Sequence, residues 1–423
     1  MKPEYFDDLI NLCTNISKQE NKLLPLCAAE NVVSPFSKIP LDTFLQEKYI
    51  MGGVIKYQEH SNFVGSKKLH GIYELLSRQC NKMYGCKYAD ARTLSGVNAV
   101  MTLLMSLFST GNTILISSEE CGGHGSMPKI CHRLGINTIE IPYNYDIYDF
   151  DYYKMNEILK SQKIDGILIC LSDIIIMPQL NKIALPENCI LIFDATQILG
   201  LIATKTIDNP LKWFNEDQKF IMMGATHKTL PGPTCGLIMT NNLKLAQQFD
   251  TLINPDYLRN SQLHHVLSLI LTLMELEICG REYCDAIINN ANKLGETLTT
   301  YDFKVVKVSL KYTYTHQLFL SMSNDAAEEF YNKCVDYGVS INFRNKHLYQ
   351  TCGLRIGTQE ITRYGWKDDE MLIIAGILRD IRDNKHLSQD ISARINELAT
   401  SKHLCYTIES QYYDVIYNAL HHS

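Results

Sequence analysis

Short apolar runs rich in β-branched residues alternate with longer helical patterns along most of this chain. Such runs suit strands that are buried on both faces of a sheet, and parallel neighbouring strands need crossover helices between them. The pattern therefore predicts an α/β fold with a large, mainly parallel sheet. The strands expected in it are Thr113–Ser117, Gly166–Leu171, Cys189–Phe193, Lys219–Met223 and Gly236–Thr240.

The remaining segments predict helices and a second, smaller α/β lobe. Val97–Phe108 is a long apolar helix, and the helix His264–Cys279 is followed by a polar helix, Ala286–Thr299, that connects the lobes. We expect an N-terminal arm (1–35), a large domain (36–285) and a small C-terminal domain (286–423). The small domain is expected to contain strands at Phe303–Leu310, Gln317–Met322, Val339–Asn342 and Gly353–Ile356, and helices at Ala326–Tyr337 and Asp368–Arg382.

Composition narrows the classes of function. The formal charge is -6 and charged residues make up 20% of the 423 residues, without a basic stripe, so we expect no nucleic-acid partner. The longest apolar candidate for a membrane span, 166–180, is broken by Asp173 and Pro178, and the first residues lack a signal pattern. Fourteen scattered cysteines without a Cys-x-x-Cys motif indicate a reducing cytoplasm and no metal site.

A lysine follows one of the predicted buried strands. Lys228 lies in the segment Gly224–Pro233, a polar turn that begins where the strand Lys219–Met223 ends. Burial lowers the pKa of an amine and makes it a nucleophile suited to a Schiff base with a carbonyl cofactor. The alternative is a solvated loop lysine before a Gly-Pro turn.

Three other motifs also lie at strand ends or helix starts. Asp194 follows a buried strand and could pair with a protonated pyridine nitrogen, or it could cap a helix. Ser95-Gly96 begins an apolar helix and could bind a phosphate or act as an ordinary helix cap. His124 lies in a glycine-rich loop and could face a flat ring or lie in a flexible turn. The combination with Lys228 indicates pyridoxal phosphate (PLP).

The order and the residues of these motifs resemble those of the serine hydroxymethyltransferase family, which belongs to the fold-type-I PLP-dependent transferases. The resemblance runs from about residue 24 to residue 382, and its most specific part is Thr226–Leu230 with Gly232-Pro233. It implies a large mainly parallel sheet domain, a smaller C-terminal α/β domain and a homodimer. The matching stretches are Leu26–Asn31, Lys56–Glu59, Ser95-Gly96, Gly122–His124, Asp194–Gln197, Thr226–Leu230 and Gly353–Thr358.

The resemblance also implies a role for each matching residue. Lys228 would form the Schiff base, Asp194 would bond the ring nitrogen, and His124 would stack on the ring as a catalytic residue. Arg355 would bind the substrate carboxylate, and Glu59 would be the acid/base near the substrate hydroxyl. Cofactor contacts are also implied for Ser95, Gly96, Ser172, Gln197, Thr226, His227, Tyr57 and Arg259, of which Tyr57 and Arg259, like Glu59, would reach across the dimer interface.

For three of these residues a plainer interpretation stays open. Arg355 could be a surface ion-pair partner, Glu59 a solvated charge and Ser172 a strand-end hydroxyl.

The chain departs from the family pattern mainly where folate and substrate bind. Ala29 replaces a serine, Gln197 replaces a histidine and Thr234 replaces an arginine. The tyrosine-containing stretch after the glutamate is shortened to His60–Phe63, and a glycine-rich segment appears here as Asp256–Asn260. The cofactor half is retained and the folate half is eroded, so PLP is the predicted cofactor and tetrahydrofolate is doubtful.

We therefore predict aldol or retro-aldol chemistry on glycine, serine or a β-hydroxy amino acid, without a requirement for folate. One alternative is a PLP-dependent desulfurase, lyase or aminotransferase of the same fold, in which Cys352 would be the candidate thiol nucleophile. The other is a cofactor-binding fold that acts only in interactions, which the intact set of Lys228, Asp194 and His124 disfavours.

Overall fold

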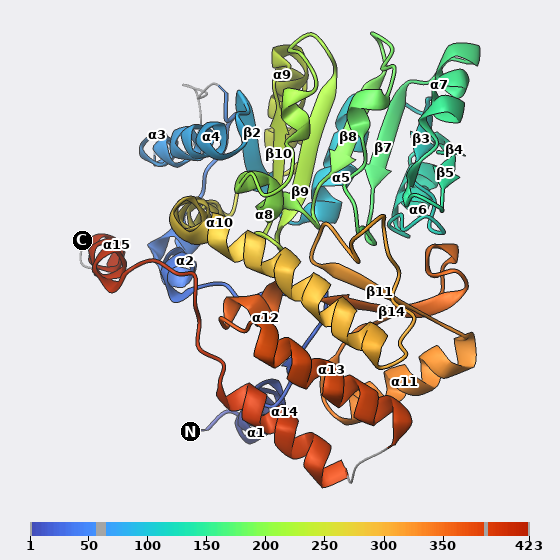
Figure 1. The fold of residues 1–423 in the computed structure, drawn as a ribbon. Coiled ribbons are helices and arrows are strands. Elements are labelled where there is room, and N and C mark those ends of the chain that lie inside the picture. The colour runs from blue at the N-terminus through green and yellow to red at the C-terminus, as the bar shows by residue number, and fades with distance from the viewer. Residues whose placement is uncertain (1, 56–64, 385–387, 422–423) are drawn as a thin grey trace. The chain divides into compact units, whose positions relative to one another are not determined.

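The computed structural model describes residues 2–55, 65–384 and 388–421 and divides the chain into two compact units. The larger unit comprises 29–285 and 406–423, and the smaller unit comprises 1–28 and 286–405. Each unit therefore combines segments that are far apart in the sequence. Figure 1 gives the ribbon with its element labels.

A seven-stranded sheet forms the centre of the larger unit, in the order β2-β10-β9-β8-β7-β3-β4 (Figure 1). The strands β9, β8, β7, β3 and β4 are parallel to one another, whereas β10 is antiparallel to both β9 and β2. The fold class is thus confirmed as mainly parallel α/β. The strands are β2 (Tyr88–Thr93), β3 (Thr113–Ile116), β4 (Asn137–Glu140), β7 (Gly166–Cys170), β8 (Ile190–Asp194), β9 (Phe220–His227) and β10 (Pro231–Thr240).

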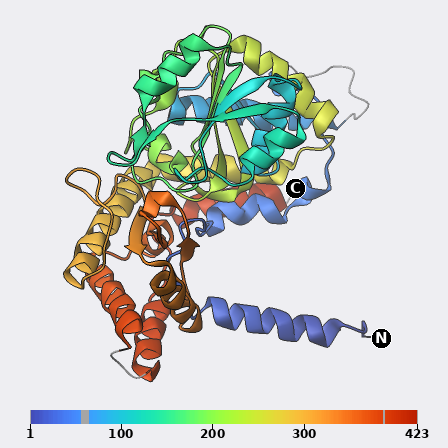
Figure 2. The same ribbon diagram turned by 90° about the vertical axis from the view of Figure 1, so that its right-hand side faces the viewer.

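Helices cover the sheet, as Figure 2 shows from a second direction. On one face, alternate strand residues such as Ile114, Leu168 and Ile192 pack with Leu103 of α5 and Phe249 of α9 in one buried cluster. Strand residues of the opposite parity, including Ile167 and Leu191, are also buried. Burial on both faces explains the continuous apolar runs. The unit's helices are α2 (Pro35–Lys38), α3 (Ser66–Leu69), α4 (Gly71–Tyr84), α5 (Gly96–Leu107), α6 (Met127–Arg133), α7 (Tyr152–Ser161), α8 (Leu199–Ala203) and α9 (Leu243–Thr251).

All five predicted strands of the large sheet are present, and the sequence interpretation missed two others. It overlooked β2, whose sequence contains Asp90 and Arg92, and β4, whose residues are mostly exposed. The segment Gly224–Pro233 is not the polar turn that its sequence predicts. Instead, β9 continues to His227 and β10 begins at Pro231, so the motif forms a tight hairpin.

The smaller unit contains a three-stranded sheet covered by helices. Its strands are β11 (Gln317–Met322), β14 (Cys352–Gly357) and β13 (Asn342–Arg344), in that order, and its helices include α11 (Asn324–Asp336), α12 (Gln359–Arg363), α13 (Asp368–Asp383) and α14 (Ser388–Thr400). The strand predicted at 303–310 is wrong, because this segment makes only isolated bridges at Val305 and Val308. The N-terminal helix α1 (Phe6–Glu20) is exposed along its whole length.

Helix α10 (Leu263–Thr300) is a single helix of 38 residues where two were predicted. It is the one described helix that is long and apolar enough to cross a membrane, but 61% of its apolar window is buried inside the protein. A core helix of a soluble protein has the same character.

The C-terminal segment packs with the larger unit. Helix α15 (Ser410–His421) places Tyr413, Ile416 and Leu420 against a small buried cluster that includes Phe36 and Leu271. Burial of this apolar surface explains why 406–423 belongs to the larger unit and not to the smaller one.

A buried charge network connects β2 to the loop that follows residue 48. The guanidinium of Arg92, which is 1% exposed, donates to both carboxylate oxygens of Asp90 and, at 2.8 Å, to Oδ1 of Asp250. It also donates to the carbonyl of Gly52 at 2.9 Å, while Asp250 accepts the backbone N–H of Val54 at 2.6 Å. The network therefore anchors 52–54 to the sheet.

We expect Arg92→Met to destabilise the protein by about 3–5 kcal/mol, because it leaves two buried carboxylates without their counter-charge. Urea unfolding followed by circular dichroism would measure the change. Arg281→Ala is the control, since Arg281 pairs with Asp285 at an exposed position and should cost less than about 1 kcal/mol. A similar loss in both variants would contradict this account.

Candidate active site

The predicted cofactor motifs meet at one edge of the large sheet. His124 lies in the loop after β3, Ser172 follows β7, Asp194 ends β8 and Lys228 follows β9. Because these strands are parallel, their carboxyl ends lie at the same edge. Strands β2 and β9 are both antiparallel to β10, so Ser95, just after β2, lies at this edge as well.

Asp194 is half-buried and accepts two hydrogen bonds. Its Oδ1 accepts the backbone N–H of Thr196 at 2.8 Å, and its Oδ2 accepts the thiol of Cys170 at 3.0 Å. Thr196 in turn accepts the backbone N–H of Ala225 through its hydroxyl, which ties the end of β8 to β9. The carboxylate is therefore oriented by its own chain and is not merely a helix cap.

The His124 loop folds back onto β7. The backbone N–H of His124 donates to the carbonyl of Cys170 at 2.9 Å, and Ser172 donates its N–H to Gly122 at 2.8 Å. A side chain at Gly123 could not be accommodated, because its Cβ would lie 2.4 Å from the carbonyl oxygen of Ser117. The ring Nδ1 of His124 accepts the N–H of Ser126 at 3.2 Å, so a neutral ring carries its proton on Nε2.

Ser95 and Gly96 begin helix α5 beside the end of β9. The Ser95 hydroxyl caps the helix by accepting the N–H of Asn98 at 3.2 Å. A Cβ on Gly96 would lie 2.9 Å from the Cβ of Ala225, so glycine permits the close approach of helix and strand. The other N–H groups of this first turn have no partner inside the helix, which suits an anionic phosphate.

The Lys228 segment is held by several side chains of the larger unit. Asn31 donates to the carbonyl of Lys228 and, at 2.8 Å, to the hydroxyl of Tyr283. The hydroxyl of Thr229 donates to the carbonyl of Gln197 at 2.9 Å, which fixes the turn against the segment after β8. Lys228 itself is half-buried and so is not a freely solvated loop lysine.

Two residues next to Lys228 differ in their surroundings. The hydroxyl of Thr226 is buried and donates to the carbonyl of Pro233, so it serves the hairpin. Among the described residues, no group hydrogen-bonds the buried Nδ1 of His227. Burial, and secondarily the positive charge of Lys228, lowers the pKa of His227. An unpartnered buried donor or acceptor here fits a site that takes a polar ligand.

The remaining predicted residues belong to segments other than the loops of this edge. Arg259 is exposed, and its carbonyl accepts a hydrogen bond from Asn254 at 3.1 Å. Arg355 belongs to the smaller unit, where it is 2% exposed and donates to Oδ1 of Asn342 at 2.9 Å, so it is not a surface ion-pair partner. Tyr57 and Glu59 lie outside the described residues.

Sequence reasoning assigned no role to Cys170, Thr196 or Asn31, although each holds a predicted site residue. Thr196 and Asn31 stand inside quoted motifs, so their position was a usable signal. Cys170 gave none, because a cysteine in an apolar strand looks like any other small core residue.

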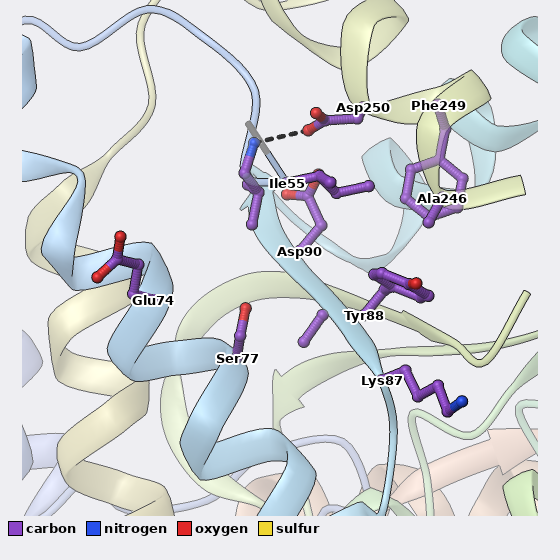
Figure 3. A pocket seen from close by; sticks show the side chains of 11 residues that line it. Ile55, Glu74, Ser77, Lys87, Tyr88, Asp90, Ala246, Phe249 and Asp250 are labelled. Carbon is purple, nitrogen blue, oxygen red and sulfur yellow. Dashed lines mark hydrogen bonds between the residues drawn. The ribbon is translucent and has the colours of Figure 1, made fainter. Parts of the chain in front are cut away.

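A cavity of about 300 Å³ lies elsewhere in the larger unit, near the start of β2. In Figure 3, Glu74 and Ser77 of α4 approach it from one side, and Phe249 and Asp250 of α9 from the other. No predicted cofactor-binding residue lines it. It is therefore separate from the edge that carries Lys228 and Asp194.

The sheet and its overall fold identify the class of protein. The chain has the fold of the fold-type-I PLP-dependent transferases. A crystal structure of L-threonine transaldolase from Pseudomonas fluorescens in its internal aldimine state matches this chain with a TM-score of 0.90. The match covers 98% of this chain and 97% of the transaldolase chain at 21% sequence identity.

Sequence comparison names the family. The profile of the family described as serine hydroxymethyltransferase matches residues 4–378. The serine hydroxymethyltransferase of Sulfolobus acidocaldarius is 28% identical over 399 residues, covering 90% of each chain, and that of Picrophilus torridus is 29% identical over 417 residues, covering 94% of each. The chain belongs to the serine hydroxymethyltransferase family and is a PLP-dependent transferase.

We expect His227, which is half-buried, to make stability depend on pH. Its lowered pKa means that the unfolded chain binds a proton more readily than the native protein, so stability falls as the pH falls below about 6.5. His227→Asn should therefore flatten the dependence of urea unfolding between pH 7.5 and 5.5. The exposed His132 offers the control His132→Asn, and equal slopes in wild type and His227→Asn would contradict the prediction.

Proposed function

We propose that this enzyme catalyses aldol or retro-aldol chemistry on glycine, serine or a β-hydroxy amino acid. The observation that carries the proposal is the juxtaposition of Asp194 and Lys228 at the carboxyl edge of the sheet, beside the N-terminus of α5. When bound, PLP supplies an electron sink for the substrate carbon that loses a proton or an aldehyde.

Each residue of the edge would bind a different group of PLP. Lys228 provides the amine for the Schiff base, and Asp194 provides the carboxylate for the protonated ring nitrogen. The first turn of α5, with Ser95 and Gly96, receives the phosphate through backbone N–H groups. His124 is placed on a loop tied to β7, which suits a ring that packs on the cofactor.

The substrate groups come from two further residues. Arg355 would bind the α-carboxylate, and its guanidinium is already held in place by Asn342. Glu59 would accept the β-hydroxyl proton during C–C bond cleavage and return it to the aldehyde in the reverse direction. Both assignments follow from the matching motifs around these residues.

We further propose that the reaction does not require folate. Ala29, Gln197 and Thr234 stand where the family pattern has other residues, and the tyrosine-containing stretch is shortened. L-Threonine transaldolase, by its name, acts on the β-hydroxy amino acid threonine. An aldehyde acceptor in place of folate is consistent with the loss of the folate half.

The desulfurase alternative receives no support from Cys352. This thiol is 1% exposed and donates to the carbonyl of Arg344 at 3.2 Å. Burial raises its pKa, whereas a desulfurase needs an accessible, readily ionised thiol.

We also propose that the protein is a homodimer and that it is located in the cytoplasm. Met101 and Met105 lie one turn apart on α5 and, with Leu94 just before this helix, form an apolar row, each about 40% exposed. A second copy that covered this row would exclude water from these apolar side chains. All fourteen cysteines are free thiols, which suits a reducing compartment.

We expect the purified protein to bind PLP with a visible absorbance band that Lys228→Ala abolishes, because the Schiff base needs the amine. Glycine, serine or threonine should change the band. Tetrahydrofolate should leave the response to glycine unchanged. Absence of a band in the wild type would refute the cofactor assignment, and a strong folate effect would refute folate independence.

We expect Met101→Glu with Met105→Glu to convert a dimer into a 48.3 kDa monomer, because the charges prevent burial of the row. Sedimentation equilibrium measures the mass. Val335→Glu, at another exposed apolar position, should remain dimeric. A monomeric wild type would contradict the dimer.

A further inference from the structure

Cys170 and Asp194 make a side-chain contact that the proposed function does not use. They are register partners on the parallel strands β7 and β8, so their side chains lie on the same face of the sheet. The thiol donates to Oδ2 of Asp194 at 3.0 Å, while the backbone N–H of Thr196 donates to Oδ1 at 2.8 Å. Each carboxylate oxygen therefore receives one donor from the protein.

The backbone around the thiol is fixed by its own hydrogen bonds. The N–H of Cys170 donates to the hydroxyl of Ser117, and that hydroxyl donates to the carbonyl of Cys170, both at 3.1 Å. The same carbonyl accepts the N–H of His124 at 2.9 Å. One residue thus joins the His124 loop through its backbone and Asp194 through its side chain.

The thiol acts as a donor because it keeps its proton. Cys170 is 2% exposed, and burial, followed by the charge of Asp194, raises its pKa well above the ordinary value. The positive charge of Lys228 acts in the opposite direction but is the smallest of these influences. A protonated thiol can donate to a carboxylate but is a poor nucleophile.

We propose that Cys170 is a positioning residue that holds the carboxylate of Asp194 oriented toward the PLP ring nitrogen. The inference rests on the proposed function, because it takes Asp194 to be the partner of that nitrogen. One donor on each oxygen fixes the orientation of the carboxylate that would pair with the protonated pyridine. Loss of the thiol should therefore weaken the grip on the cofactor without removing any cofactor contact.

The test is the affinity of the full-length apoprotein for PLP, titrated by absorbance. Cys170→Ala should bind PLP about three- to tenfold more weakly, the loss expected for one ordinary hydrogen bond, because a thiol is a weak donor and acts on PLP only through Asp194. Cys170→Ser restores a donor of similar size and should bind within about twofold of the wild type. Cys189→Ala, which removes a buried thiol just before β8 at its other end, should bind like the wild type.

A double-mutant cycle separates this role from general packing. In an Asp194→Asn background, Cys170→Ala should cause no further loss of affinity, because the carboxylate it serves is absent. Thermal unfolding of each apoprotein identifies variants that fail to fold, and Cys170→Val then provides a larger apolar side chain without a strong donor.

The outcomes distinguish the two proposals. If wild type binds PLP and Asp194→Asn weakens binding, but Cys170→Ala or its Val substitute binds like the wild type, only the role of Cys170 is overturned. An equal loss in the wild-type and Asp194→Asn backgrounds, or a Cys170→Ser variant as weak as Cys170→Ala, also overturns it. A wild type that binds no PLP overturns the proposed function together with this inference.

Discussion

Parallel pairing of β3, β7, β8 and β9 is the constraint on which the rest of the site depends. Parallel strands bring the loops that follow them to one edge, so residues more than a hundred positions apart in the sequence become neighbours. Register then decides the details. Cys170 faces Asp194 because they pair across β7 and β8, and a shift by one residue would turn either side chain to the other face.

The large sheet could be predicted from the sequence because its central strands are covered on both faces and are apolar throughout. Strand β2 could not be predicted because it contains the charged residues Asp90 and Arg92. Their charges are balanced only in the folded protein, where Arg92 pairs with Asp90 and with Asp250 of α9. The opposite error occurs at 303–310, where the sequence predicts a strand that is absent. Its β-branched residues pack without forming a ladder of paired strands. Tertiary context decided both cases.

The site shows a similar division. Lys228, Asp194, Ser95 and His124 could be proposed from short motifs at strand ends. The donors that orient Asp194 could not all be proposed, because the contact with Cys170 depends on the register between two strands. Local motifs therefore indicate which groups meet the cofactor, whereas the network that tunes those groups becomes visible only in three dimensions.

The division of the chain into interleaved segments has a consequence for how the protein is made. The chain passes between the units at residues 28–29, 285–286 and 405–406, so neither unit is a continuous piece of sequence. During synthesis, the sheet and its cofactor edge emerge before residues 286–405, but the apolar cluster around Phe36 and Leu271 lacks its cover by α15 until that helix leaves the ribosome. The larger unit is therefore completed only after every residue of the smaller unit has been synthesised.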